Sequence, residues 1–341
     1  MRRTAPALLA LLFLAAAALT AACGGSDGGG EPLVVYSGRE QELVEPLYAK
    51  FTADTGIELD VRWGDSAALS ATILEEGDAS PADVFYAQDA GSIGVLDGLL
   101  AELPADDRAL IPAQYQDSGG RWVGVTGRAR VMAYNTERVE AAQLPGSVLE
   151  LAQADWPLGP IGVAPTNASF VGFVGALRQV LGDEATQAWL DGIATHARTY
   201  EKNSQIVDAV AAGEVDTGLV NHYYLYEKLA SDPAAPIANH YFVGADVGSF
   251  VNVAAVGVLA GSERQADAET FVTWLLTEGQ VFFAAEAEER EYPLNATQPG
   301  LEAAADLPPL ADLSGPEIDL AALAAGLEGT VQMIRDAGLV T

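Results

Sequence analysis

Short apolar runs alternate with segments of helical period from residue 33 onward, and this alternation constrains the fold more than any other feature of the sequence. Residues 33–36 form an apolar run of strand length. Residues 41–53 then carry apolar side chains on one helical face, namely Val44, Leu47, Tyr48 and Phe51. The pattern repeats with a strand at 57–63, a helix at 67–75 and a strand at 83–86. It predicts an open α/β sheet that binds ligands at the carboxyl ends of its strands.

A second β-α series follows in the rest of the chain. Two apolar runs, at 122–125 and 131–134, bracket the polar residues 126–130. We then expect, in order, a strand at 161–163, helices at 169–180, 184–193 and 204–212, and a strand at 217–220. The apolar run 250–260 is long enough to cross back between two lobes, and helices at 266–276 and 318–337 would close the two halves.

Size and charge bound the function. The chain has 341 residues, of which 50% are hydrophobic, so it can bury one large core or two moderate ones, and we expect two lobes. A formal net charge of −31 argues against a nucleic-acid partner, because an acidic surface repels phosphate groups. Many acidic proteins carry such a charge for solubility alone, so it gives no positive indication of function.

The N-terminus has the three parts of an export signal. Arg2 and Arg3 precede an apolar run at 5–19, and small residues follow up to Cys23. The segment 1–22 resembles a bacterial lipoprotein signal that ends at Cys23, although Thr20 stands where such signals usually carry leucine. An ordinary signal peptide and an uncleaved anchor helix are the alternatives.

Cys23 is the only cysteine of the chain, so no disulfide and no cysteine-built metal site is expected. A lone thiol at this position fits lipidation. Residues 23–31 are rich in glycine and too polar to pack, and we expect them to form a flexible tether between the membrane and a fold that begins near Pro32.

The segment 218–229, G-L-V-N-H-Y-Y-L-Y-E-K-L, places two neighbouring tyrosines where an apolar strand gives way to a helical pattern. Neighbouring side chains diverge on a regular strand or helix, so Tyr223 and Tyr224 can reach one point only at a strand-to-helix turn. We expect that turn here, with Asn221 as the helix cap and the helix at 225–230. Two phenols indicate ferric iron, because a hard trivalent ion would ionise them.

The pattern alone favours another interpretation of this segment. Tyr223, Tyr226 and Leu229 are spaced to form a buried helix face, which would leave Tyr224 on the surface. His222 adjoins the pair, but nothing requires it as a ligand, and we expect it to be a satisfied loop histidine.

A family resemblance instead favours the interpretation of the two tyrosines as a ligand pair. Five motifs occur in the order and spacing of the ferric-iron-binding proteins of bacterial ABC importers: V-Y-S-G-R-E at 35–40, S-P-A-D-V-F at 80–85, G-R-A-R-V at 127–131, P-T-N-A-S-F at 165–170 and N-H-Y-Y at 221–224. The likeness extends from about residue 33 to the C-terminus. It implies a two-lobed periplasmic-binding-protein fold of type II, transferrin-like, with a ligand cleft between lobes joined by crossover strands.

The resemblance implies Tyr223 and Tyr224 as phenolate ligands of Fe(III). Glu40 stands where many members have a histidine ligand, and a carboxylate suits ferric iron at least as well. A first-turn glutamate favoured by the helix dipole is an equally natural interpretation of Glu40. Gln88, followed by Asp89, stands where some members have a glutamate ligand, and Phe170 where another branch has a tyrosine.

The family completes the iron site with a synergistic anion, phosphate or carbonate. Asn167, Ala168 and Ser169 open a helix whose free N–H groups favour an anion, and Asn203 matches a family anion contact. Arg39 resembles the arginine that holds carbonate in some members. N-capping is an equally good interpretation of the asparagines and the serine. The arginines at 128 and 130 can equally be structural.

These implications define a function and a domain organisation. We expect a monomeric, lipid-anchored receptor outside the cytoplasm that binds an iron ion or a small iron chelate and delivers it to an ABC permease. The lobes are expected at 32–128 plus 255–304 and at 129–254 plus 305–341. Enzyme motifs such as G-x-S-x-G, H-E-x-x-H and the P-loop do not occur, so we expect no enzyme. The rival is a receptor for a polyamine, a phosphonate or an oxyanion.

Overall fold

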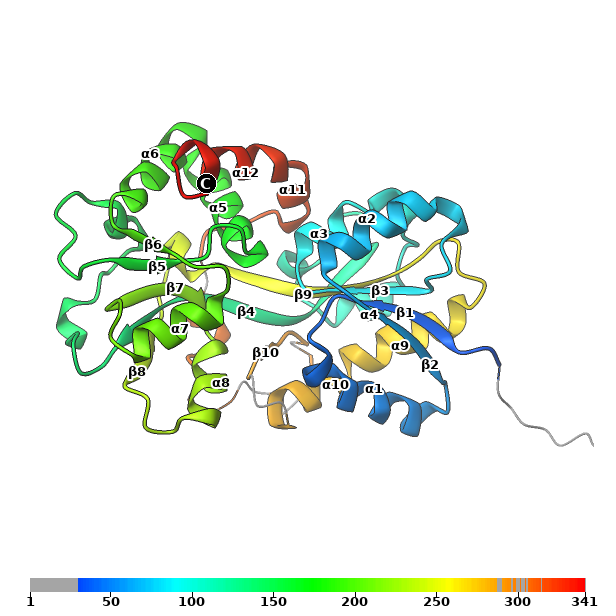
Figure 1. The fold of residues 1–341 in the computed structure, drawn as a ribbon. Helices are drawn as coiled ribbons and strands as arrows, with labels where there is room; N and C mark the ends of the chain where they lie inside the picture. Colours follow the sequence, from blue (N-terminus) through cyan, green and yellow to red (C-terminus); the bar gives the residue numbers. More distant parts are fainter. Residues whose placement is uncertain are drawn as a thin grey trace, which may run out of the picture.

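Figure 1 shows a computed structural model of the protein, in which two α/β lobes are joined by long strands that run between them. The structure describes residues 30–286, 290–295, 297–298, 301, 304, 306–313 and 315–340. The export signal, Cys23 and most of the expected tether lie outside these residues. Among the described residues, no helix is both long and apolar enough to cross a membrane.

The first lobe begins with the β-α alternation that the sequence predicts. Its elements are β1 (Leu33–Ser37), α1 (Gln41–Thr55), β2 (Leu59–Trp63), α2 (Ser66–Glu76), β3 (Val84–Ala87), α3 (Ala90–Gly94) and α4 (Ala105–Ala109). The helix α1 buries the four side chains expected from its period. Phe51 packs edge-on against Phe271 with ring centroids 4.9 Å apart, so the lobe is closed by a helix from late in the chain.

The second lobe contains a second β-α series. Its elements are β5 (Ile161–Val163), α5 (Ala168–Leu181), α6 (Asp183–Ala194), β6 (Ala197–Thr199), α7 (Asn203–Ala211), β7 (Thr217–Asn221), α8 (Tyr224–Ser231) and β8 (Ile237–His240). The chain then returns through β9 (Val251–Val258) to α9 (Gln265–Leu276), α10 (Glu278–Val281) and β10 (Tyr292–Pro293). It ends with α11 (Leu320–Ala325), which packs against α3 of the first lobe, and α12 (Leu327–Asp336), which packs against α5 and α6 of the second lobe (Figure 1).

The strand order is β2-β1-β3-β9-β4-β7-β5-β6, with β4 (Trp122–Asn135) at its centre. The strand β4 changes partner part-way along its length. Ala129 is the last residue of β4 that pairs with β9, and Arg130 is the first that pairs with β7. This switch supports the division that we propose, 32–128 plus 255–304 for one lobe and 129–254 plus 305–341 for the other.

Three sequence predictions about elements are wrong. The two runs at 122–125 and 131–134 are one strand, because the polar residues between them are also buried and hydrogen-bonded in the sheet, with a bulge between Gly124 and Thr126. The helix expected at 318–337 is two helices, separated at Gly326. Asn221 does not cap α8; it is the last residue of β7, and its side chain accepts a hydrogen bond from Arg130 instead.

Candidate functional site

The tyrosine pair lies at the turn between β7 and α8, where the sequence predicts it. Tyr223 has helical backbone angles at the N-cap position, and Tyr224 is the first residue of α8. Their ring centroids are 4.3 Å apart, with 32° between the ring planes. The turn therefore brings two consecutive phenols together rather than splaying them.

Both phenols are withdrawn from water. Tyr223 is buried and Tyr224 is half-buried. Burial, and next the nearby Tyr224, raises the pKa of Tyr223 well above its ordinary value. Burial also raises the pKa of Tyr224, while hydrogen bonds from Tyr223 and Asn203 act in the opposite direction. In the metal-free protein both side chains are therefore neutral phenols at neutral pH.

The buried stripe proposed as an alternative is not what α8 forms. Its buried side chain is Leu225, whereas Tyr226 and Leu229 are only half-buried. Tyr224, which the stripe would leave on the surface, lies against Tyr223 instead.

His222 is a satisfied histidine, as expected. It is fully buried, its Nδ1 accepts the N–H of Ala129 at 3.2 Å, and its Nε2 therefore carries the proton and donates to the carbonyl of Arg290 at 2.9 Å. Burial lowers the pKa of His222 to about 4. Both ring nitrogens are thus engaged away from the tyrosine pair.

Arg130 supplies a positive charge next to the phenols. Its guanidinium donates to the oxygens of Leu219 at 2.8 Å, Ser169 at 3.2 Å and Asn221 at 3.4 Å. No ion pair joins it to a carboxylate within the described part of the chain. Burial lowers the pKa of Arg130 to about 9, whereas the two tyrosines favour its charged form. A buried cation of this kind favours an anion or ionised phenols beside it.

The residues expected to hold an anion form one connected cradle at the N-terminus of α5. Asn167 caps the helix by accepting the N–H of Ser169, and the Ser169 hydroxyl donates to Asn167 at 2.6 Å. Ala168 is exposed at the first helical position. The Asn203 amide donates to both Asn167 and Ser169 at 3.1 Å, so Asn203 does not cap its own helix. Through Arg130 and Asn203 the cradle adjoins the tyrosine pair.

The two other candidate ligands, Glu40 and Gln88, lie in the first lobe rather than at the tyrosine turn. Glu40 is exposed at the N-cap of α1 and caps no backbone N–H with its side chain. Gln88 is half-buried at the end of β3, and its side-chain oxygen has no hydrogen-bond partner within the described residues. Asp89 is a helix cap, because its carboxylate accepts the N–H and the hydroxyl of Ser92. No cluster of three or more His, Cys, Asp or Glu that could hold a metal occurs in the part of the chain that the structure describes.

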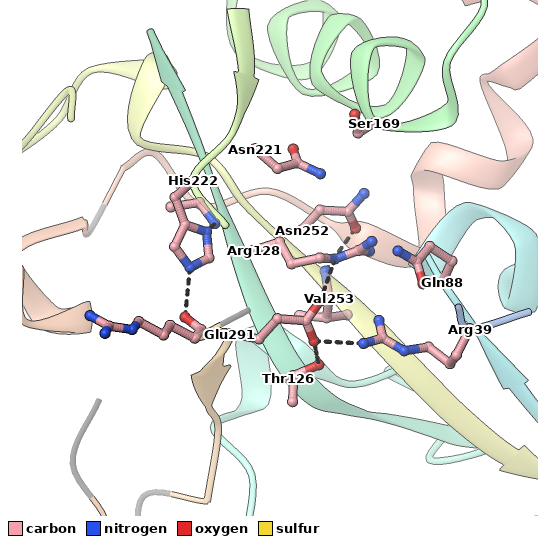
Figure 2. A network of polar contacts seen from close by, with 12 residues as sticks. Arg39, Gln88, Thr126, Arg128, Ser169, Asn221, His222, Asn252, Val253 and Glu291 are labelled. Atoms are coloured by element: carbon pink, nitrogen blue, oxygen red, sulfur yellow. Dashed lines mark hydrogen bonds and ion pairs between the residues drawn. The ribbon is translucent and has the colours of Figure 1, made fainter. Parts of the chain in front are cut away.

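A buried ion-pair network adjoins the site (Figure 2). Glu291 lies between Arg39 and Arg128, and also accepts the hydroxyl of Thr126. Burial acts to raise the pKa of Glu291, but Arg39, then Arg128, and the Thr126 hydrogen bond hold that pKa below its ordinary value. Arg39 and Arg128 thus both lie beside the same buried acid, Glu291.

Three polar side chains of this region were missed by the sequence analysis: Thr126, Asn252 and Glu291. Asn252 is a single amide in the apolar run 250–260, and that contrast could have revealed it. Glu291 sits among other charged residues, and no local pattern distinguishes it from them.

A family model for bacterial extracellular solute-binding proteins matches residues 36–282. The chain belongs to this family. As a member of the extracellular solute-binding proteins it is a binding protein rather than an enzyme, and it works outside the cytoplasm, which confirms both expectations. The two-lobed α/β periplasmic-binding-protein fold is confirmed as well.

Several proteins similar to this solute-binding protein are described as binding iron. The "Fe(3+)-binding periplasmic protein" of Serratia marcescens is 35% identical over 313 residues, which is 90% of each chain. Iron-bound HitA from Pseudomonas aeruginosa is 32% identical with a TM-score of 0.82, over 90% of this chain and 99% of HitA. A Trichodesmium protein, FutA, in complex with iron and citrate is 25% identical with a TM-score of 0.78, over 91% of this chain and all of that one.

Proposed function

We propose that this solute-binding protein binds Fe(III) through the phenolates of Tyr223 and Tyr224. The observation that carries the proposal is that the two phenols lie together at the N-terminus of α8, with their ring centroids 4.3 Å apart. A hard trivalent cation displaces phenol protons as it displaces those of other acidic ligands. The relatives described as Fe(3+)-binding and iron-bound support the same cargo.

A synergistic anion completes the iron site in this proposal. The cradle of Asn167, Ala168, Ser169 and Asn203 offers donors at a helix N-terminus, and Arg130 adds a charge beside it. Phosphate and carbonate both suit such donors. The Trichodesmium relative in complex with iron and citrate supports an organic iron chelate as the third possibility.

Glu40 and Gln88 are the further ligands that we propose, and Arg39 is the further anion contact. Each lies just after β1 or β3 in the first lobe, and in this proposal their contacts with the bound solute form as the lobes close. Delivery to an ABC permease in the membrane, anchoring through a lipid on Cys23, and a monomeric state belong to the same proposal.

The charges around the cleft argue against a polyamine as the solute. Arg39, Arg128 and Arg130 are buried there, and among the residues that the structure describes Glu291 is the buried carboxylate beside them. A polycation would add to this excess of positive charge, whereas an anion would neutralise it. A phosphonate or an oxyanion without iron is therefore the second candidate.

Loading the purified protein with ferric citrate, followed by desalting, tests the proposal. Phenolate-to-Fe(III) charge transfer should give a visible absorption band with one iron bound per chain. A protein that stays colourless and iron-free, yet retains phosphate or a phosphonate in equilibrium dialysis, would instead establish the second candidate.

A further inference from the structure

Glu291 is a buried carboxylate beside the site. Its side chain is 1% exposed, and its Oε2 lies 2.8 Å from Nη2 of Arg39 and 2.5 Å from the hydroxyl of Thr126. Its other oxygen, Oε1, lies 3.9 Å from Nε of Arg128 (Figure 2). The carboxylate therefore connects the loop after β1, where Arg39 and Glu40 lie, with the long strand β4 that joins the lobes.

The backbone around Glu291 reaches the tyrosine turn as well. The carbonyl of Arg290 accepts the His222 Nε2–H at 2.9 Å, and His222 directly precedes Tyr223. On the other side, Tyr292 pairs with Gly127 of β4, and its ring centroid lies 5.0 Å from that of His222. Residues 290–292 thus contact three segments around the proposed site: the loop after β1, the strand β4 and the turn before α8.

Removing the charge of Glu291 would leave two guanidiniums buried side by side. Arg39 and Arg128 are each 3% exposed, so water cannot compensate for the lost carboxylate, and their mutual repulsion would move them. Any movement of Arg39 alters the loop that carries Glu40. Residues outside the ligand set that orient ligands in this way typically change metal affinity by about ten- to a hundredfold.

We propose that Glu291 is a positioning residue of the iron site, which holds Arg39 and Arg128 in place beside the tyrosine turn. This inference rests on the proposed binding of Fe(III) to Tyr223 and Tyr224. A merely structural role would lower the stability of the fold and leave the spectrum of bound iron unchanged. A positioning role changes the geometry around the metal, and therefore its charge-transfer band.

The first test compares wild type with Glu291→Gln in the mature chain. Ferric nitrilotriacetate is the iron source, affinity is measured by competition with citrate, and the position of the absorption band is recorded at saturation. We expect Glu291→Gln to weaken iron binding about ten- to a hundredfold and to shift the band. The matched control is Asp107→Asn, because Asp107 is also a buried carboxylate that accepts a threonine hydroxyl, from Thr273, but lies away from the site. Its iron affinity and band should equal those of the wild type.

A milder change keeps the test valid if Glu291→Gln fails to fold. Thr126→Val removes only the hydroxyl that fixes the carboxylate, and Thr126→Ser restores it. Thr126→Val should weaken iron binding severalfold and shift the band in the same direction, and Thr126→Ser should return both to wild type.

The outcomes separate the two claims. A normal wild-type band, with folded Glu291→Gln or Thr126→Val that matches it in affinity and band position, overturns the inference and leaves the proposed function intact. A wild-type protein that forms no band at all overturns the proposed function, and the positioning role with it.

Discussion

The rings of Tyr223 and Tyr224 lie against each other, with their centroids 4.3 Å apart and their planes 32° from parallel. Consecutive side chains can lie this way only because the chain changes from strand to helix at this point: β7 ends at Asn221 and α8 begins at Tyr224. The relationship places two proton-bearing oxygens side by side next to the guanidinium of Arg130, whose charged form they favour. A trivalent cation that replaces the two protons would turn a neutral pair into a dianionic clamp.

Removing either hydroxyl of this pair should abolish tight iron binding. We expect Tyr223→Phe and Tyr224→Phe each to weaken Fe(III) affinity by at least a hundredfold, because each loses a direct ligand while its ring still packs. Competition with citrate measures the affinity, and circular dichroism checks that the fold is kept.

Tyr226→Phe is the control for this pair, because Tyr226 is the next phenol on α8 and stands outside the proposed ligand set. It should bind iron as the wild type does. Unchanged affinity in both Tyr223→Phe and Tyr224→Phe would remove the chemical basis of the iron proposal.

Glu40→Gln tests the candidate ligand at the start of α1. Because its carboxylate is exposed and caps no backbone N–H, it is available to a metal when the lobes close. We expect the substitution to lower iron affinity about tenfold or more and to shift the charge-transfer band, with no loss of thermal stability beyond the few tenths of a kcal/mol of a helix-dipole interaction.

Glu42→Gln separates the two interpretations of Glu40. Glu42 is the acidic residue in the first turn of the same helix, so its replacement removes a similar dipole interaction without touching the proposed site. If both variants lose only the same small amount of stability and keep wild-type iron affinity, Glu40 is a helix-terminus residue and no ligand.

The sequence predicted the elements and the tyrosine turn because both depend on local patterns. Hydrophobic period located α1 and its buried face. The junction of an apolar strand with a helical segment located the turn at Tyr223 and Tyr224, but that pattern alone favoured a buried helix face, and the family resemblance was needed to favour a ligand pair. The polar network could not be predicted in this way. Glu291 meets Arg39 from a point 252 positions away along the chain, and only the folded sheet brings them together.

Side-chain roles at the second lobe show the same limit. Asn203 lies at a helix start, where capping is the natural local interpretation, yet its amide reaches 36 positions back to Asn167. Arg130 had no partner assigned from the sequence, and its observed partners are a carbonyl, a serine and an asparagine. Tertiary contacts set the partners of both side chains, and the local sequence does not show those contacts.

Ser169→Ala and Asn203→Ala test the anion cradle. Each removes a donor or acceptor from the group that links Asn167 to the tyrosine pair. We expect iron retention to become less dependent on added phosphate or carbonate, with affinity in saturating anion reduced about tenfold. Ser231→Ala, at a surface serine that bonds the carbonyl of Lys228, is the control and should keep the wild-type anion dependence. If a cradle variant keeps the wild-type dependence on added anion, the anion binds elsewhere.

His222 should make the stability of the iron-free protein depend on pH. Its folded pKa of about 4 lies below the ordinary value of 6.5, so between these values the unfolded chain binds a proton that the folded protein excludes. Stability therefore falls as pH drops from about 6.5 to about 4, by up to about 3 kcal/mol from this residue. His222→Gln keeps a donor for the Arg290 carbonyl but cannot titrate, so urea unfolding should show a correspondingly smaller fall across this window. His196→Gln, at a histidine outside the site that also bonds a backbone carbonyl, is the control for replacing a histidine. If the stability of His222→Gln falls as steeply with pH as that of the wild type, the His222 ring is not kept neutral in the folded protein at acidic pH.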